Sequence, residues 1–394
     1  MPSIIAAKKV GVLLGGSGLI GGAITYYFKK IASRDIELFS PNSKKLSLRV
    51  PNDIKQYFKK IKPDFIINTA IASLDSDPQL SLETNYIGSI NLARAAASLN
   101  IPYIHFSSSA TMPNGLDLSE DENLPLTPAL SNYAKSKLMA ELTLRHMWEN
   151  EGLDCTIIRL GVVYGRHDHK IQGFHRLLYS IADQAMPFMM TKHGILHSYT
   201  NAHKIPPFVH YILDHRNEFS QQIYNFVDHN PIDLSELILT IKSYLQLRLP
   251  REIYIPYSMA HMGRAILGWL IKKLNVISIE ARIPAELMFL ENFYLTQTLA
   301  TDKLAGSSYG LPEPGKTVFT ELPAMIEYYL SRWEHLNLIS SFDESYCQPA
   351  LLSNSFSTAP EKLLQAVNDN KLPELADFSE LRTPGIPYKI SHTR

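Results

Sequence analysis

A glycine-rich turn near the start of the chain constrains its fold more than any other feature. Residues 13–22 read LLGGSGLIGG; an apolar run at 10–14 leads into them, and a helical pattern follows to about residue 30. Glycines at a strand-to-helix junction permit a tight turn and let the backbone approach a pyrophosphate, which the helix N-terminus faces with unpaired N–H groups. The motif reads either as G-x-G-x-x-G from Gly16 or as glycines at 15, 18 and 21, and we expect it to bind the diphosphate of a dinucleotide.

The first 165 residues alternate between short apolar segments and amphipathic ones. Strands are predicted at residues 10–14, 36–39, 46–50, 65–68, 103–107 and 155–160, and helices at about 19–30, 54–61, 82–99 and 132–150. Such alternation predicts a parallel sheet built by right-handed crossovers. The expected fold class is α/β, a Rossmann-type doubly wound parallel sheet with a smaller, mixed C-terminal substrate lobe.

The pattern loosens after residue 165, where helices are predicted at 173–185, 234–247 and 320–334. We therefore divide the chain into three parts. Residues 1–165 form the dinucleotide-binding core, residues 166–336 the substrate lobe with elements that return to the core, and residues 337–394 a polar tail of uncertain order.

Composition narrows the classes of partner. The 38 Lys and Arg balance 38 Asp and Glu, and this zero net charge argues against a nucleic-acid binder. Two cysteines exclude a disulfide scaffold and a thiolate metal cluster, and no metal site is expected from the histidines at 167, 169 and 175. Without a signal-peptide pattern or a transmembrane run, the chain is expected to be cytoplasmic, with a small-molecule substrate.

A second motif combines a tyrosine with a lysine. In YAKSK at 133–137, one helical turn separates Tyr133 from Lys137, so both lie on one helix face. A neighbouring ammonium lowers the pKa of a phenol from about 10, which suits proton transfer near neutral pH. The spacing alone is weak evidence, because Tyr26 and Lys30 share it.

The serines of HFSSSATM, at 105–112, strengthen that motif. They end a predicted strand, and open α/β sheets bind ligands at the carboxyl ends of their strands. A serine hydroxyl there can bind a substrate oxygen and complete a Ser–Tyr–Lys relay. The alternative is a polar strand end whose hydroxyls bond to local backbone; the glycine turn and Tyr133 favour the relay.

Taken in order, these motifs resemble the extended short-chain dehydrogenase/reductase family, in its NAD-dependent epimerase/dehydratase group. The resemblance covers roughly residues 8–334. The matching segments are 14–21, 63–70 (PDFIINTA), 85–88 (NYIG), 106–111, 133–137 and 159–165 (RLGVVYG), with weaker matches at 224–227, 234–237 and 310–314. The serine and tyrosine motifs look closest to UDP-galactose 4-epimerases, and the short stretch 50–73 to dTDP-4-dehydrorhamnose reductases.

The resemblance implies a role for each matching residue. Ser109 would orient the substrate oxygen, Tyr133 would be the acid/base, and Lys137 would bind the nicotinamide ribose. The implied cofactor-binding residues are Gly15, Gly18, Leu19, Ile20, Gly21, Ser40, Thr69, Ala70, Asn85, Ser107, Tyr133, Lys137 and Val162, and the implied substrate contacts are Thr111 and Arg166. The implied chemistry is hydride transfer between NAD or NADP and a secondary alcohol or ketone of a nucleotide-activated sugar, in a homodimer.

Departures from the family pattern bear on cofactor and substrate. The usual acid after the second strand is Ser40 here, with Lys44 and Lys45 beyond it, which slightly favours NADP. A solvated loop explains the lysines almost as well. Residues 197–203 lack the arginine that often binds the substrate diphosphate, so Arg166 or Arg176 would have to replace it.

Two alternatives stay open beside this reading. The apolar, amphipathic segment 258–274 indicates lobe core, the wall of a sterol or lipid site as in 3β-hydroxysteroid dehydrogenase-like enzymes, or a membrane-surface helix. A non-catalytic dinucleotide-binding protein is opposed by the intact set of Ser109, Tyr133 and Lys137. Dehydration is the least favoured reaction, since no acid lies at residues 111–112.

Overall fold

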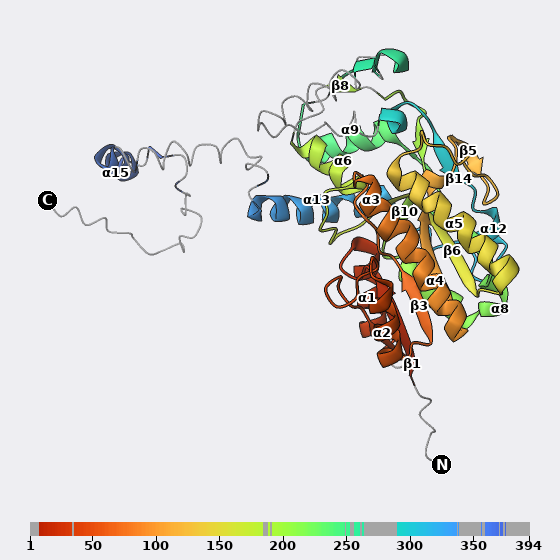
Figure 1. Ribbon diagram of the computed structural model, residues 1–394. Coiled ribbons are helices and arrows are strands. Elements are labelled where there is room, and N and C mark those ends of the chain that lie inside the picture. Colours follow the sequence, from red (N-terminus) through yellow and green to blue (C-terminus); the bar gives the residue numbers. More distant parts are fainter. Residues whose placement is uncertain are drawn as a thin grey trace. The chain divides into compact units, whose positions relative to one another are not determined.

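The computed structural model of the chain contains a central sheet of six parallel strands (Figure 1). The order across the sheet is β11 (Gln222–Phe226), β6 (Cys155–Leu160), β4 (Tyr103–Ser108), β3 (Phe65–Asn68), β1 (Lys9–Leu14) and β2 (Ile36–Phe39). The chain passes from β1 outward to β2 and then crosses to β3 on the other side of β1. The sheet therefore changes direction between β1 and β3, where such sheets bind ligands. The predicted Rossmann-type sheet is confirmed.

The structure describes part of the chain. The described residues are 8–33, 35–183, 188–189, 191–248, 250–252, 256–260, 262–263, 290–336, 338, 356, 359–369, 371–372 and 375. Most of the segment 258–274, with its three alternative interpretations, lies outside these residues, as does most of the tail 337–394. Within the described residues, no helix has the length and apolar character needed to cross a bilayer.

Helices cover both faces of the sheet because successive strand side chains point to opposite faces. Helices that pack on this sheet are α1 (Leu19–Lys30), α2 (Pro51–Ile61), α4 (Gly88–Leu99), α5 (Asn132–Glu151) and α7 (Ile205–Asp214). Leu13 of β1 belongs to the core beneath α1 and α7, whereas its neighbours Val12 and Leu14 belong to the core beneath α2, α4 and α5. The apolar run of β1 is thus buried on both sides, as a central parallel strand requires.

A second, mixed sheet forms the smaller lobe. Its order is β12 (Ile232–Asp233), β9 (Leu196–His197), β14 (Gln297–Leu299) and β5 (Gly115–Leu118), beside a pair of β7 (Val162–Tyr164) and β10 (Tyr199–Asn201). The remaining elements are α3 (Pro78–Ser81), a π-helix (Leu82–Ile87), 3-10 helices Ser109–Thr111 and Leu290–Phe293, α6 (Gly173–Ala182), α8 (Arg216–Phe219), α9 (Leu234–Tyr244), α12 (Asp302–Ala305), α13 (Val318–His335), α15 (Pro360–Asn368), β8 (Phe188–Met189) and β13 (Arg251–Glu252). The expected mixed lobe is present, although β5 comes from the first 165 residues.

The prediction of a strand at residues 46–50 is wrong. The backbone N–H groups of Lys45 and Leu46 both donate to the carbonyl of Asn42 at 3.0 Å, so the segment closes a local turn. Leu46 and Leu48 are still buried, in the core that α2 and α4 share. Their alternation therefore reflects packing beneath helices, and no strand forms.

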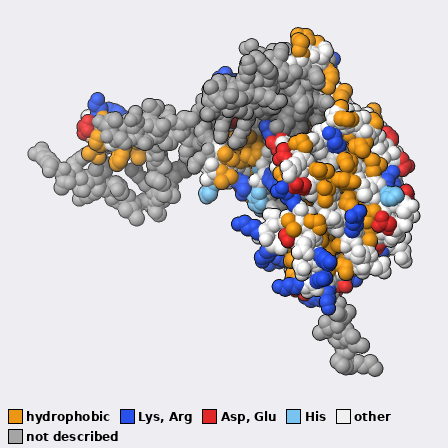
Figure 2. Space-filling model, in the orientation of Figure 1, with side chains coloured by type: hydrophobic (Ala, Val, Ile, Leu, Met, Phe, Trp, Pro, Cys, Tyr) orange, Lys and Arg blue, Asp and Glu red, His pale blue; other side chains and the backbone are white. Residues whose placement is uncertain are grey.

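The chain divides into two compact units, Met1–Ser331 and Arg332–Arg394. The boundaries proposed at residues 165 and 336 stay predictions. In the second unit, α15 has no buried residue. In the first, Lys and Arg side chains gather over α1 and α2 (Figure 2), whose last turns carry basic pairs where the helix dipole favours positive charge.

Candidate active site

The glycine turn after β1 is shaped by close backbone contacts. Gly15 has a φ of +83°, a conformation that side chains disfavour, and its carbonyl accepts a hydrogen bond from Gly18 N at 3.0 Å. A Cβ atom added to Gly21 would lie 2.2 Å from Gly15 O, and one added to Gly15 would lie 2.6 Å from Ala70 N. Glycine is therefore required at both positions.

The outer side of this turn fits a diphosphate. A Cβ atom at Gly18 would meet only Gly15 O, at 3.4 Å, so that face of the turn is open. Gly18 is also the N-cap of α1, where no side chain caps the helix and the first turn, with Leu19 and Ile20, carries no acid. Uncapped N–H groups at a helix N-terminus attract anions. The residues present fit the diphosphate of a dinucleotide.

Thr69 and Ala70 close the turn from the end of β3. The backbone N–H and the hydroxyl of Thr69 both donate to Leu14 O, at 3.0 and 2.7 Å. Ala70 N donates to the side chain of Asn68 at 3.1 Å. The Thr69 hydroxyl therefore holds two strand ends together, and the chain beside it faces the glycine turn.

Ser40, directly after β2, lies against the same turn. A Cβ atom at Gly16 would fall 1.8 Å from Ser40 Oγ, so the hydroxyl touches the glycine. Lys44 and Lys45 are exposed, and their backbone N–H groups donate to the side chain of Asn42. The structure thus places Ser40 against the glycine turn of residues 15–21, called the dinucleotide cradle below. It leaves both lysines in a solvated turn.

On the other side of the site, α5 presents Tyr133 and Lys137 one turn apart. The helix begins after Ser131, whose hydroxyl accepts from Ala134 N at 3.1 Å and caps it. Lys137 is 2% exposed, and its ammonium donates to the backbone carbonyl of Phe106 in β4 at 2.7 Å. Burial lowers the pKa of Lys137 to about 8, although the charge of Glu141 opposes this shift.

The pKa of Tyr133 is raised by burial, and the hydrogen bond from Ser108 partly offsets that rise. The expectation that Lys137 lowers the pKa of Tyr133 is wrong. The Lys137 ammonium donates to Phe106 O, and the side chain that lowers the pKa of Tyr133 is that of Ser108. Tyr133 is therefore a protonated acid in the protein alone.

The three serines of the strand end take different positions. Ser107 is buried, and its hydroxyl has no hydrogen-bond partner among the described residues. Ser108 ends β4, where its hydroxyl accepts from Ala110 N at 3.2 Å and lowers the pKa of the neighbouring Tyr133. Ser109 begins the 3-10 turn, and its carbonyl accepts from the Gln297 side chain at 3.1 Å. The structure brings Ser108 to Tyr133, and a contact of Ser109 with substrate stays a prediction.

Asn85 occupies a supporting position behind the site. It is fully buried in the π-helix, and its carbonyl oxygen accepts from Ala72 N at 2.7 Å. Its amide donates to Ser136 Oγ on α5 at 3.1 Å. Asn85 thus joins the segment after β3 to the helix that carries Tyr133.

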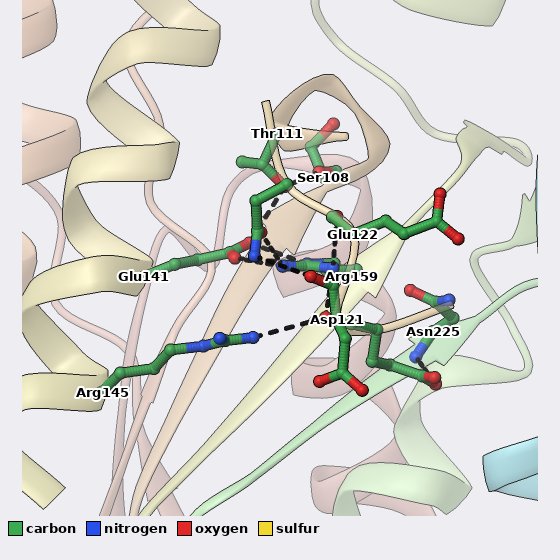
Figure 3. Close-up of polar contacts among 10 residues, drawn as sticks. Ser108, Thr111, Asp121, Glu122, Glu141, Arg145, Arg159 and Asn225 are labelled. Atoms are coloured by element: carbon green, nitrogen blue, oxygen red, sulfur yellow. Dashed lines mark hydrogen bonds and ion pairs between the residues drawn. The ribbon is translucent and has the colours of Figure 1, made fainter. Parts of the chain in front are cut away.

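The sequence analysis did not predict a buried polar network that lies beside α5, the wall of the site that carries Tyr133 and Lys137 (Figure 3). Arg159 of β6 and Glu141 of α5 form an ion pair at 2.7 Å with side chains 0% and 1% exposed. Thr111 is buried too, and its hydroxyl lies 3.2 Å from Glu141 Oε1. This arrangement turns the Thr111 hydroxyl toward the interior. The one available signal was an arginine inside the apolar strand CTIIRL.

Gly161 to Arg166 continue the site past β6. A Cβ atom at Gly161 would lie 2.2 Å from Ser198 O, so the backbone contact requires glycine at this position. Val162 N donates to the same carbonyl at 2.9 Å, so β7 starts there partly exposed. Arg166 follows β7 and is exposed. Nothing in these contacts prevents Arg166 from reaching a ligand.

Curated proteins similar to this chain include two sugar-modifying enzymes by name. GDP-L-colitose synthase of Yersinia pseudotuberculosis is 31% identical over 145 residues, which cover 35% of this chain and 46% of that protein. A dTDP-4-dehydrorhamnose reductase of Sinorhizobium fredii is 27% identical over 166 residues, covering 41% and 53%. The chain spans about half the length of these two relatives.

Solved structures share the fold over most of this chain. UDP-glucose 4-epimerase of Thermus thermophilus, in complex with NAD, aligns with a TM-score of 0.58 at 17% identity and covers 81% of this chain and 98% of its own. A dTDP-4-dehydrorhamnose reductase of Bacillus anthracis, solved in complex with NADP, aligns with a TM-score of 0.57 at 14% identity and covers 82% of this chain and 99% of its own. Residues 12–194 match the NAD dependent epimerase/dehydratase family. The expected resemblance to the NAD-dependent epimerase/dehydratase group of the extended short-chain dehydrogenases/reductases is confirmed over these residues.

Proposed function

We propose that this protein is an NAD(P)-dependent oxidoreductase of the epimerase or reductase type. Its substrate is a secondary alcohol or ketone of a nucleotide-activated sugar. The observation that carries the proposal is the meeting of Ser108, Tyr133 and Lys137 at the end of β4, in the same sheet edge as the glycine cradle. The family match and the names of the relatives support it.

The residues of α5 and β4 perform the proton transfer in this proposal. A bound nicotinamide dinucleotide supplies the hydride acceptor or donor. Tyr133 gives its proton to a substrate carbonyl, or takes one from a substrate hydroxyl, while Ser108 or Ser109 holds that oxygen by a hydrogen bond. Lys137, whose ammonium donates to Phe106 O, binds the nicotinamide ribose from the same helix face.

Binding of the nucleotide sugar requires a cation for its diphosphate. Residues 197–203 carry no arginine, and Arg166 is exposed at the end of β7. We assign the diphosphate contact to Arg166. Thr111, whose hydroxyl is turned toward Glu141, has a supporting role in place of the substrate contact inferred from the family.

Two measurements test this function. Mass spectrometry of nucleotides released from gently purified, then denatured protein separates a retained NAD, typical of an epimerase, from exchangeable NADPH, typical of a reductase. A panel of GDP-, dTDP- and UDP-activated sugars is then assayed beside hydrophobic sterol ketones. Turnover of a nucleotide sugar is the expected result. Turnover of sterols alone would replace the sugar with a lipid substrate, and no dinucleotide binding would remove the proposal altogether.

A further inference from the structure

Arg159 has a partner for every N–H group of its guanidinium. Nε lies 3.1 and 3.2 Å from the two oxygens of Glu141, and Nη2 donates to Glu141 Oε2 at 2.7 Å and to the side chain of Asn123. Nη1 donates to the carbonyl of Glu120 at 2.9 Å and to that of Glu122 at 3.5 Å. Figure 3 shows Arg159 between α5 and the loop after β5. A guanidinium with all its donors engaged has none left for a ligand, so its role is within the protein.

The loop that receives Arg159 is itself fixed. Asn225 N of β11 donates to the side chain of Glu120 at 2.9 Å, and Arg145 of α5 donates to the Glu120 carbonyl at 3.3 Å. Arg159 thus joins α5 to an anchored loop. A contact of this kind restrains the orientation of its carboxylate partner, because the Nε/Nη2 side of the planar guanidinium faces Glu141 while Nη1 is engaged with the loop.

Glu141 links Arg159 to the residues at the end of β4. It lies one helical turn after Lys137 on α5, and its Oε1 faces the hydroxyl of Thr111 at 3.2 Å. The same hydroxyl lies 2.9 Å from the carbonyl of Ser108. The end of β4 is therefore tied, through Thr111 and Glu141, to Arg159 in the neighbouring strand.

We propose that Arg159 is a positioning residue which, through Glu141 and Thr111, holds the end of β4, and with it Ser108, in place beside the start of α5. A buried ion pair is weak evidence for stability, since apolar residues of similar volume often stabilise a core equally well. Here the pair ends at the strand terminus that carries the serine. The inference rests on the proposed function for the reaction it affects, but the geometry it describes exists without substrate.

The test removes one hydroxyl. Thr111→Val keeps the shape of the side chain and removes the single hydroxyl proton that Ser108 O and Glu141 Oε1 share. Thr111→Ser restores the hydroxyl and is expected to restore activity. Thr156→Val is the matched control, because Thr156 is equally buried in β6 and its hydroxyl donates to Phe219 O, away from the network. Arg159→Lys keeps the charge but loses the bidentate geometry.

Thr111→Val and Arg159→Lys are expected to lower kcat about tenfold with KM changed less than about twofold, since the serine would be misplaced without loss of binding. In a Ser108→Ala background, Thr111→Val should cost nothing more. Three results would overturn the positioning role. They are an equal loss of kcat from Thr111→Val with and without Ser108→Ala, an equal loss of kcat from Thr156→Val, and an unchanged kcat in Thr111→Val and Arg159→Lys.

A second readout needs no substrate. In protein labelled with 13C at tyrosine Cζ, the signal that disappears in Tyr133→Phe reports the Ser108 contact. Thr111→Val and Ser108→Ala should move this signal alike, while Thr156→Val leaves it in place. If the signal moves as expected but no nucleotide sugar reacts, the positioning holds and the proposed substrate fails. If Thr111→Val leaves the signal unmoved, the positioning is contradicted whatever the activity.

Discussion

The two sides of the candidate site are built differently. The dinucleotide cradle consists of backbone, and it depends on the absence of side-chain atoms at Gly15 and Gly21. The wall that carries Tyr133 consists of side chains, with Lys137 held among buried charges. A backbone cradle is specified by a short contiguous motif, whereas a side-chain wall needs residues far apart in the sequence. The cradle should therefore fail only where a Cβ intrudes, and the wall wherever a buried partner is removed.

The largest effect is expected from breaking the charge pair in the wall. Arg159→Met leaves the carboxylate of Glu141 buried without a partner and should lower the free energy of unfolding by about 3–5 kcal/mol. Lys9→Met, which breaks the exposed pair of Lys9 with Asp214, should cost less than about 1 kcal/mol. Urea unfolding measures both. Similar losses in the two variants would show that the wall does not depend on its buried charges.

In the cradle, the corresponding test is a single methyl group. Gly21→Ala places a Cβ atom 2.2 Å from Gly15 O and should cost about 3 kcal/mol, or about a hundredfold in the Kd of the dinucleotide. Gly22→Ala is the matched control, because its Cβ atom would have no neighbour closer than 3.8 Å. Calorimetric titration with NADH and NADPH gives the comparison. Equal dinucleotide affinity in the Gly21→Ala and Gly22→Ala variants would rule out binding of the dinucleotide at the glycine turn.

The pH dependence of the reaction probes the charge on Lys137. With a pKa of about 8, this lysine loses its proton above about pH 8, and activity should fall there. The charge of Glu141 raises the pKa of Lys137, so Glu141→Gln should move the fall to lower pH. Glu149→Gln, an exposed change on the same helix, should leave the profile in place. His105, in β4, stays neutral, because burial and Lys137 hold its pKa well below the usual value.

The same lysine affects stability with a definite sign. Its pKa is about 8 in the folded protein against 10.5 for the ordinary side chain, so the unfolded chain binds more protons between these values. Stability contributed by this group therefore rises with pH across that window. Comparing the unfolding free energy of wild type and Lys137→Met at pH 8 and pH 10 measures it, and a constant difference would contradict the burial argument.

The smallest effect concerns cofactor choice. Ser40 touches Gly16 at the end of β2, where a carboxylate would repel a 2′-phosphate. Ser40→Asp should shift the ratio of NADPH to NADH affinity toward NADH by about tenfold. Lys44→Gln, in the solvated turn, is the matched comparison. If Lys44→Gln changed the ratio of NADPH to NADH affinity and Ser40→Asp did not, Lys44 would be the residue that selects the cofactor.

The contrast between cradle and wall also explains what the sequence could predict. The order of strands and helices follows from hydrophobic periodicity, and the glycine turn, Tyr133 and Lys137 follow from local motifs. Residues 46–50 were misassigned because buried alternation looks the same under helices as in a sheet. The network of Arg159, Glu141 and Thr111 could not be predicted, since its members come from three elements that only the fold brings together. Which serine faces Tyr133 also depends on where β4 ends, and no motif gives that position.

The central claim is that Tyr133 transfers the proton during hydride transfer. The most direct measurement is turnover of the nucleotide-sugar panel, followed by the absorbance of the reduced dinucleotide or by sugar analysis, in wild type, Tyr133→Phe and Tyr26→Phe. Tyr26 is 66% exposed on α1 and is the control. The account predicts a loss of about 10²–10⁴-fold in kcat for Tyr133→Phe with dinucleotide binding kept, and no change for Tyr26→Phe. Full activity in Tyr133→Phe would contradict it.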